Sequence, residues 1–213
     1  MTIHAYDETS VYTAQNILGN AVDFSLNTLH VDPDLFGNAL SVSDASKQFA
    51  SGNPRYVSGI TGCELARCIL DETHTSYSEA EDVMYLDKSP EYWAGWALAF
   101  YQWFSSRSFM DILAAVPLSD ITCMYPVYHE MDILQFVDRM DELMVKAYPF
   151  TRLKTIRTNC GLSQSGLASV SGVALRQIQL LEQRQRDINM TAASTLLKLS
   201  RALCCRMEDL MEY

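Results

Sequence analysis

The sequence predicts an all-α fold in two parts, an acidic helical domain over residues 1–149 and a smaller five-helix domain over residues 150–213. Three observations lead to this prediction. Apolar residues recur at helical spacing along most of the chain, and no alternating run is bounded by a two-residue hairpin turn. Residues 151–213 carry nine Lys and Arg against five Asp and Glu, which is a net charge of +4. Residues 1–150 carry the other seven Lys and Arg and the other 21 Asp and Glu, which is a net charge of −14. A short break at Tyr148-Pro149-Phe150 separates the parts.

The first two helices of the acidic part are indicated by apolar spacing. We expect one helix over residues 11–29 and a second over residues 33–50. Asp32 can cap the second helix, and Pro33 suits its first position because proline has no amide hydrogen to satisfy there. The stretch 52–54 then breaks the chain with Gly, Asn and Pro.

Two capping boxes are predicted further along. Thr61 and Glu64 have the spacing at which a hydroxyl and a carboxylate each bond the other residue's amide, so we expect a helix to follow. Ser78 and Glu81 repeat the pattern and predict a short helix over residues 83–86.

The most apolar helix is expected over residues 92–104, opened by Ser89 and Pro90. A helix that is apolar most of the way round belongs in a core. Its large aromatic residues are expected to share one buried face: Trp93, Trp96, Phe100, Trp103 and Phe104. The alternative is an aromatic site for a base or a cofactor.

A short helix over residues 108–116 and a longer one over residues 131–147 complete the acidic part. The buried stripe of the longer helix is expected to comprise Ile133, Phe136, Val137, Met140, Leu143 and Met144. Its other face carries Asp132, Asp138, Asp141 and Glu142. That face is either a solvated surface or a docking surface for a basic partner or a second copy of the chain.

Composition excludes several classes of protein. The six cysteines form no C-x-x-C pair, and no His lies at metal-ligand spacing from them, so we expect reduced thiols, no metal and no cofactor. The first residues lack the features of a signal peptide, and no apolar stretch reaches the roughly 18 residues of a membrane span. We therefore expect a cytoplasmic protein with no membrane segment.

The stretch Gly161 to Glu182 predicts two short helices, over about residues 163–171 and 174–183, joined by a turn at Gly172. Glycine there suits the left-handed conformation that ends a helix. Inward-facing residues are expected at Leu167, Ala168, Val170, Val173, Ile178 and Leu181. Two helices crossing at such a turn are typical of the helix-turn-helix unit, whose second helix can enter a DNA major groove.

This stretch resembles the Cro/phage-repressor (XRE) type of helix-turn-helix domain. The matching positions are Arg157, Gly161, Leu162, Ser163, Gln164, Leu167, Ala168, Gly172, Val173, Ile178 and Glu182. The resemblance covers about residues 151–212 and implies five helices. The outer three are expected over residues 151–159, 191–203 and 207–211, with Leu153, Ile156, Cys160, Ala192, Leu196, Leu199, Leu203 and Leu210 facing inward. The resemblance also implies a salt bridge between Arg157 and Glu182 that orients the second helix of the motif.

Candidate phosphate contacts lie at both ends of the motif. Ser163 and Gln164 begin its first helix, where free backbone amides can hold a phosphate. The resemblance implies that the side chain of Gln164 contacts the DNA backbone. Gln177 is expected to turn toward the DNA backbone, and Arg184 and Arg186 follow the second helix and can reach flanking phosphates.

The candidate base-reading residues are Leu175, Arg176, Gln179 and, to a lesser degree, Leu180. Arginine can give two hydrogen bonds to guanine, glutamine can read adenine, and leucine can contact a thymine methyl group. A purely phosphate-binding role for Arg176 is the alternative.

Two functions fit this sequence. The first is a sequence-specific DNA-binding regulator, a repressor that binds a palindromic operator on double-stranded DNA as a homodimer. The second is an antitoxin whose acidic domain neutralises a basic toxin and whose helix-turn-helix domain regulates its own operon. An enzyme is not expected, because the chain has no H-E-x-x-H, no G-x-S-x-G, no phosphate loop and no paired Cys and His. We therefore name no catalytic residue.

Overall fold

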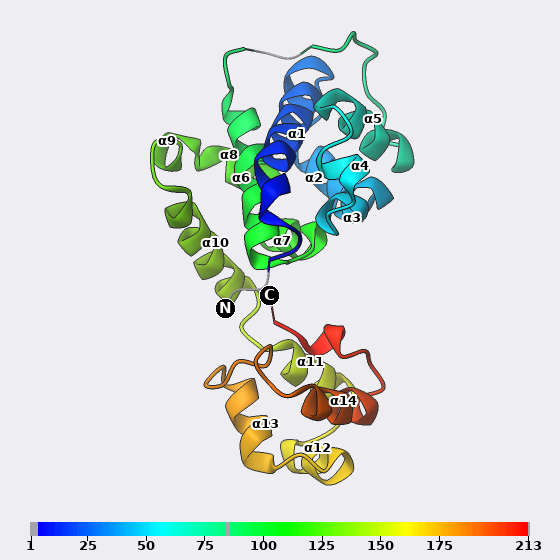
Figure 1. The fold of residues 1–213 in the computed structure, drawn as a ribbon, viewed down its shortest axis with the longest axis vertical. Coiled ribbons are helices and arrows are strands. Elements are labelled where there is room, and N and C mark those ends of the chain that lie inside the picture. The colour runs from blue at the N-terminus through cyan, green and yellow to red at the C-terminus, as the bar shows by residue number, and fades with distance from the viewer. Residues whose placement is uncertain (1–3, 84–85, 213) are drawn as a thin grey trace. The chain divides into compact units, whose positions relative to one another are not determined.

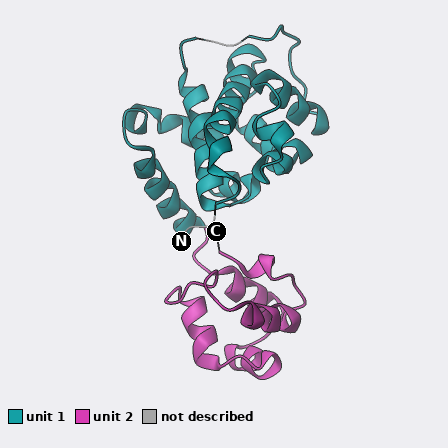
Figure 2. Ribbon diagram, viewed as in Figure 1, with its two compact units in different colours: residues 1–147 teal, residues 148–213 magenta. Residues whose placement is uncertain are grey.

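The computed structural model describes residues 4–83 and 86–212 of the 213. Within these residues the chain is helical and contains no β-strand, which confirms the all-α prediction. The helices are numbered α1 to α14 in Figure 1. The chain divides into two compact units, Met1–Ala147 and Tyr148–Tyr213, which Figure 2 colours separately.

The first unit contains ten α-helices among its described residues. They are α1 (Val11–Asp23), α2 (Pro33–Val42), α3 (Asp44–Ala50), α4 (Pro54–Val57), α5 (Gly62–Glu72), α6 (Pro90–Ser105), α7 (Phe109–Ala115), α8 (Leu118–Cys123), α9 (Tyr125–Tyr128) and α10 (Ile133–Ala147). A short 3-10 helix, Glu8–Ser10, precedes α1, and a π-helical segment, Phe24–Thr28, continues it.

Capping residues begin several of these helices where the sequence places them. The Asp32 carboxylate accepts the amides of Asp34 and Leu35 at the start of α2. The predicted capping box of Thr61 and Glu64 is confirmed, since the Thr61 side chain accepts the Glu64 amide and the Glu64 carboxylate accepts the Thr61 amide. Each cap satisfies amides that the first turn of a helix leaves without a partner.

The single helix predicted over residues 33–50 is wrong. Ser43 takes an extended conformation, with φ −60° and ψ 152°, and separates α2 from α3. Its hydroxyl accepts the amide of Ser46 at 3.2 Å, so Ser43 acts as the cap of the second helix. A serine that bonds its own neighbouring backbone competes with helix continuation, which accounts for the break.

The second predicted capping box is also wrong. Residues 75–83 form no helix, so Ser78 and Glu81 begin none. The segment is instead held from α5, because one Arg67 nitrogen donates to the Ala80 carbonyl at 2.8 Å and another contacts the Asp82 carboxylate. Of the short helix predicted next, residues 84 and 85 lie outside the described residues.

Helix α6 packs along α1 (Figure 1). A Cβ atom added at Gly95 would lie 2.6 Å from the Leu18 carbonyl oxygen and 2.7 Å from the Val22 side chain. The two backbones therefore approach more closely than any larger residue would allow. Residues of α6 that are at most 1 % exposed are Ala94, Ala97, Leu98, Ala99, Tyr101 and Gln102.

The face predicted for α6 is therefore wrong in part. Trp93 and Trp103 are buried, as expected, but Trp96, Phe100 and Phe104 are only partly buried at the edge of the core. The close packing of α1 explains the difference. The side of α6 that bears small residues faces α1, so some of the large aromatic rings lie at the edge of the core instead of inside it.

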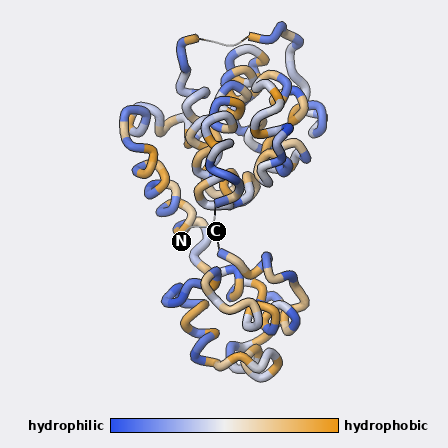
Figure 3. Tube along the Cα trace, in the orientation of Figure 1, coloured by the Kyte–Doolittle hydropathy of each residue, from blue (hydrophilic) through white to orange (hydrophobic). Residues whose placement is uncertain are grey.

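Helix α10 carries an apolar stripe, and Figure 3 shows apolar and polar residues alternating along it. Phe136, Val137, Met140 and Met144 are buried as predicted, whereas Ile133 and Leu143 are half-buried. The acidic face is not wholly solvated: Asp141 accepts a hydrogen bond of 2.7 Å from the hydroxyl of Tyr101.

The second unit has its own apolar core. Its helices are α11 (Arg152–Asn159), α12 (Gln164–Ser171), α13 (Leu175–Glu182), α14 (Ala193–Ala202) and a closing 3-10 helix, Glu208–Leu210. The buried core comprises Leu153, Leu167, Val173, Ile178, Leu181, Ile188, Leu196, Leu199, Leu203 and Leu210.

Three residues expected inside this core are exposed. Val170 is 65 % exposed, because the inward stripe of α12 passes through Leu167 and Ala168. Cys160 follows the last residue of α11, where the chain turns through Gly161 in the left-handed conformation. Ala192 precedes α14 and is likewise exposed.

The close approach of α1 and α6 is testable through the substitution Gly95→Ala. Because the new methyl group would meet backbone, we expect the free energy of unfolding of the first unit to fall by about 3 kcal/mol. Tryptophan fluorescence during urea denaturation measures it, since all three tryptophans lie in α6. Thr13→Ala at an exposed position of α1 is the control, with an expected change within about 0.5 kcal/mol. A Gly95→Ala protein as stable as the control would contradict the tight packing.

Candidate functional site

The candidate site is formed by α12, α13 and the turn between them. Ser163 caps α12, its hydroxyl accepting the Gly166 amide at 2.9 Å. Gly172 ends α12 in the left-handed conformation, with φ +67°, as the sequence predicts. Val173 then enters the core, and α13 begins after Ala174. The turn is thus fixed by one glycine and one buried valine.

The first turn of α13 presents its side chains to solvent. Leu175 is 40 % exposed and Arg176 is exposed, while Gln177, Gln179 and Leu180 are half-buried. Ala174 stands at the N-cap position and offers no side-chain hydrogen bond to the helix. The residues predicted to read bases therefore lie on one short helix, with Leu175 and Arg176 the most accessible.

A buried ion pair ties α11 to the end of α13. Arg157 donates from Nε to one oxygen of Glu182 at 2.6 Å and from a terminal nitrogen to the other at 2.9 Å. A third nitrogen donates to the carbonyl of Leu162 at 2.6 Å, in the loop before α12. The side chains are only 9 % and 2 % exposed. This bidentate geometry fixes three segments of the unit relative to one another.

The side chain predicted to bind phosphate at Gln164 is engaged inside the protein. Its amide nitrogen donates to the second oxygen of Glu182 at 2.8 Å. Gln164 thus extends the ion pair rather than projecting its side chain freely. The Ser163 hydroxyl accepts the Gly166 amide and lies 3.0 Å from the Ser165 hydroxyl, and the backbone amides of the first turn of α12 are further donors that an anion could use.

Opposing effects set the pKa of Glu182. Burial by itself raises this pKa, but the hydrogen bonds from Arg157 and Gln164, together with the Arg157 charge, outweigh burial and hold the pKa below its ordinary value. The carboxylate is therefore charged at neutral pH and accepts all three donated hydrogens.

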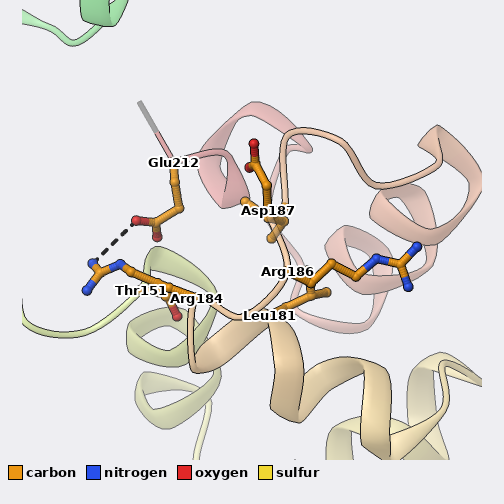
Figure 4. Close-up of a pocket in the computed structure, with 7 residues that line it drawn as sticks. Thr151, Leu181, Arg184, Arg186, Asp187 and Glu212 are labelled. Atoms are coloured by element: carbon orange, nitrogen blue, oxygen red, sulfur yellow. Dashed lines mark hydrogen bonds and ion pairs between the residues drawn. The ribbon is translucent and has the colours of Figure 1, made fainter. Parts of the chain in front are cut away.

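Arg184, predicted to contact phosphate, makes bonds within its own unit. Its guanidinium donates to the carbonyls of Tyr148 at 2.9 Å and Pro149 at 3.3 Å, and it pairs with Glu212 at 3.5 Å. The dashed line in Figure 4 marks the pair. Arg184 itself is left-handed, with φ +53°, which turns the chain sharply after α13. This turn directs the Arg184 side chain back onto its own unit.

Glu212 is a structural residue that the sequence analysis missed. One carboxylate oxygen accepts the Arg152 amide at the start of α11 at 2.5 Å, and its backbone amide donates to the Asn189 side chain at 3.0 Å. Glu212 and Arg184 also line a cavity of about 210 Å³, together with Thr151. No sequence signal could have found them, because the partners lie 23 to 60 residues apart without a local pattern.

Arg186 is exposed, and Figure 4 shows its side chain extending away from the Arg184 and Glu212 pair. It is therefore the predicted phosphate contact that the loop leaves accessible. On α11, the ammonium of Lys154 lies 3.7 Å from the centre of the Phe150 ring. This cation–π contact engages the Lys154 charge within the second unit.

Comparison of the chain with protein-family models, curated proteins and solved structures gave no match. Among residues 4–83 and 86–212, no helix combines the length and apolar character that crossing a membrane requires. The same residues contain no cluster of three or more His, Cys, Asp or Glu side chains that could hold a metal ion. Any function must therefore be argued from the residues of the site itself.

The Arg157 and Glu182 pair makes a prediction for Glu182→Gln. Removing one charge leaves a buried guanidinium without its counter-ion, so we expect local stability of the second unit to fall by about 3 kcal/mol at neutral pH. Because folding lowers the pKa of Glu182, the pair stabilises the fold above the ordinary pKa of 4.5 and loses this contribution as pH falls below it. The variant is expected to lack this acid-dependent loss.

Amide hydrogen exchange of peptides from α11 and α13 in the full chain measures both effects. Glu208→Gln at an exposed position is the control, with an expected change within about 0.5 kcal/mol. Equal exchange in both variants would show that the ion pair does not hold the two helices together.

Proposed function

We propose that residues 148–213 form a helix-turn-helix domain of the Cro/phage-repressor type and that the protein is a sequence-specific DNA-binding regulator. The observation that carries the proposal is the exposed first turn of α13, with Leu175 and Arg176, on a helix whose other end is fixed by the buried Arg157 and Glu182 pair. A helix that is anchored at its C-terminal end and has accessible donors at its N-terminal end can present those donors to a major groove.

The proposed roles follow from exposure and chemistry. Arg176 donates to guanine, Leu175 contacts a thymine methyl group, and Gln179 reads adenine from a half-buried position, with Leu180 beside it. Backbone amides at Ser163 and Gln164, the side chain of Gln177 and the guanidinium of Arg186 contact phosphates. The net charge of +4 over residues 151–213 supports such contacts.

We further propose that the protein represses transcription as a homodimer on a palindromic operator. A single α13 contacts too few base pairs for high specificity, and a two-fold dimer doubles the site, with half-sites about 34 Å apart. The acidic residues 1–147 then serve dimerisation or the binding of a signal. A net charge of −14 over residues 1–150 makes direct contact of these residues with the duplex unfavourable.

Selection of duplexes from a randomised pool by the full chain tests the function and the role of Arg176 together. We expect enrichment of a palindromic sequence. Arg176→Ala is expected to weaken binding to that sequence by about tenfold or more and to relax the preference at one position of each half-site. The control is Arg201→Ala, which removes an exposed arginine of α14 outside the motif. If no duplex is enriched at low ionic strength, the proposed function is wrong.

The internal bonds of Arg184 give a second test on the selected duplex. Arg186→Ala should reduce the slope of log affinity against log salt by about 0.9 per subunit, because one phosphate contact is lost. Arg184→Ala should leave that slope unchanged, since its guanidinium is bonded within the unit. Gel-shift titrations over a range of salt concentrations measure both slopes. A reduced slope for Arg184→Ala would restore it as a phosphate contact.

A further inference from the structure

A second site is indicated in the first unit, at the beginning of α6. A cavity of about 410 Å³ opens there between α6 and the segment that joins α9 to α10. Its walls include Tyr92, Trp93 and Trp96 of α6 and Tyr128 of α9. This volume lies within the range of small-molecule sites, which are typically lined by aromatic side chains with a few polar groups. The cavity belongs wholly to the first unit and has no part in the proposed DNA site.

The aromatic wall is held in place by the core. Trp93 makes edge contacts with Tyr125 at 5.8 Å and with Phe136 at 5.4 Å between ring centres, so its orientation is fixed. Trp96 is only half-buried, which leaves part of its indole available in the cavity. A wall of this kind can stack on a ligand without first having to become ordered.

One ring of the cavity already binds a cation. The ammonium of Lys88 lies 4.0 Å from the centre of the Tyr92 ring and 3.3 Å from the side-chain oxygen of Asn20. The electron-rich face of an aromatic ring attracts ammonium groups in this way. Lys88 also lines the cavity, but its charge is already engaged by the Tyr92 ring and the Asn20 side chain.

The remaining charges near the cavity are mostly negative. Asp132 lies at its rim and accepts the Leu134 amide through one oxygen at 2.9 Å, which leaves its charge and further acceptor capacity available. His129 stacks on Tyr125, with 4.3 Å between the ring centres. The Nε2 atom of His129 lies 3.6 Å from the Glu130 carboxylate. The net charge of −14 over residues 1–150 adds a field that favours cations over anions.

We propose that this cavity binds an organic cation with an apolar body, of the aryl or alkyl quaternary ammonium class. The aromatic wall contacts the apolar body and the face of the cationic group, and Asp132 supplies the counter-charge at the rim. Such a ligand would provide residues 1–147 with a chemical signal.

Titration of the full chain with benzyltrimethylammonium tests the proposal. Tryptophan fluorescence is a direct readout because Trp93 and Trp96 line the cavity, while Trp103 lies apart, donating to the Tyr6 carbonyl and stacking on His4. We expect saturable binding of benzyltrimethylammonium, at least fivefold weaker binding of the neutral benzyl alcohol, and the weakest binding for the anion phenylacetate. Calorimetry gives the affinities independently.

Three variants locate the ligand. Asp132→Asn removes the charge while keeping a side chain that can cap α10, so we expect about fivefold weaker binding of the cation. Lys88→Ala removes a competing positive charge, so we expect tighter binding of the cation. Trp96→Leu should weaken binding by about tenfold and leave Trp93 as the reporter. Far-UV circular dichroism establishes that each variant folds.

The opposite pattern would overturn the proposal. Preference for phenylacetate, together with weaker binding in Lys88→Ala, would make the cavity an anion site. Equal affinity for all three probes, or unchanged affinity in both Asp132→Asn and Trp96→Leu, would mean nonspecific apolar binding. Absence of any saturable signal at millimolar probe would mean that no site of this chemistry exists. None of these outcomes bears on duplex selection, so the two proposals fail separately.

Discussion

The second unit depends on one interaction, the buried bond between Arg157 and Glu182. The small apolar core has few residues with which to fix the orientation of five short helical elements. The directional ion pair fixes that orientation in addition to the core. Gln164 and the Leu162 carbonyl complete its hydrogen bonding, so the charges are buried without being left unsatisfied. The orientation of α13, and with it the direction of Arg176, follows from this network.

Local chemistry made much of the fold predictable. The capping box at Thr61, the glycine turn at Gly172 and the stripe of α10 each depend on residues only a few positions apart, which a sequence displays directly. The break at Ser43 could not be predicted in the same way, because a serine inside an apolar pattern is compatible with either a continuous helix or a cap. The buried side of α6 depended on the approach of α1, a contact that crosses some 75 residues of chain.

In the candidate site, too, some features could be predicted from the sequence and others depend on residues far apart in the chain. The positions of Leu175 and Arg176 on an exposed first turn follow from helical periodicity, whereas the pairing of Arg157 with Glu182 was expected only because the stretch resembles the Cro/phage-repressor type. The partners of Arg184 were not accessible to either kind of reasoning. Its role is set by a left-handed backbone and by carbonyls 35 and 36 residues away, and only the folded chain brings these together. The DNA roles themselves remain predictions.

Ala174 has a consequence for motion rather than for architecture. A helix without a side-chain cap loses about 1 kcal/mol at its N-terminus relative to one with serine or threonine. Since local opening is governed by local stability, the first turn of α13 opens about fivefold more often than a capped turn would. The accessible end of α13 is thus its least ordered part, while the end that bears Glu182 is held firmly. A bound phosphate or base edge that ordered this turn would release less free energy than contact with a fully formed helix.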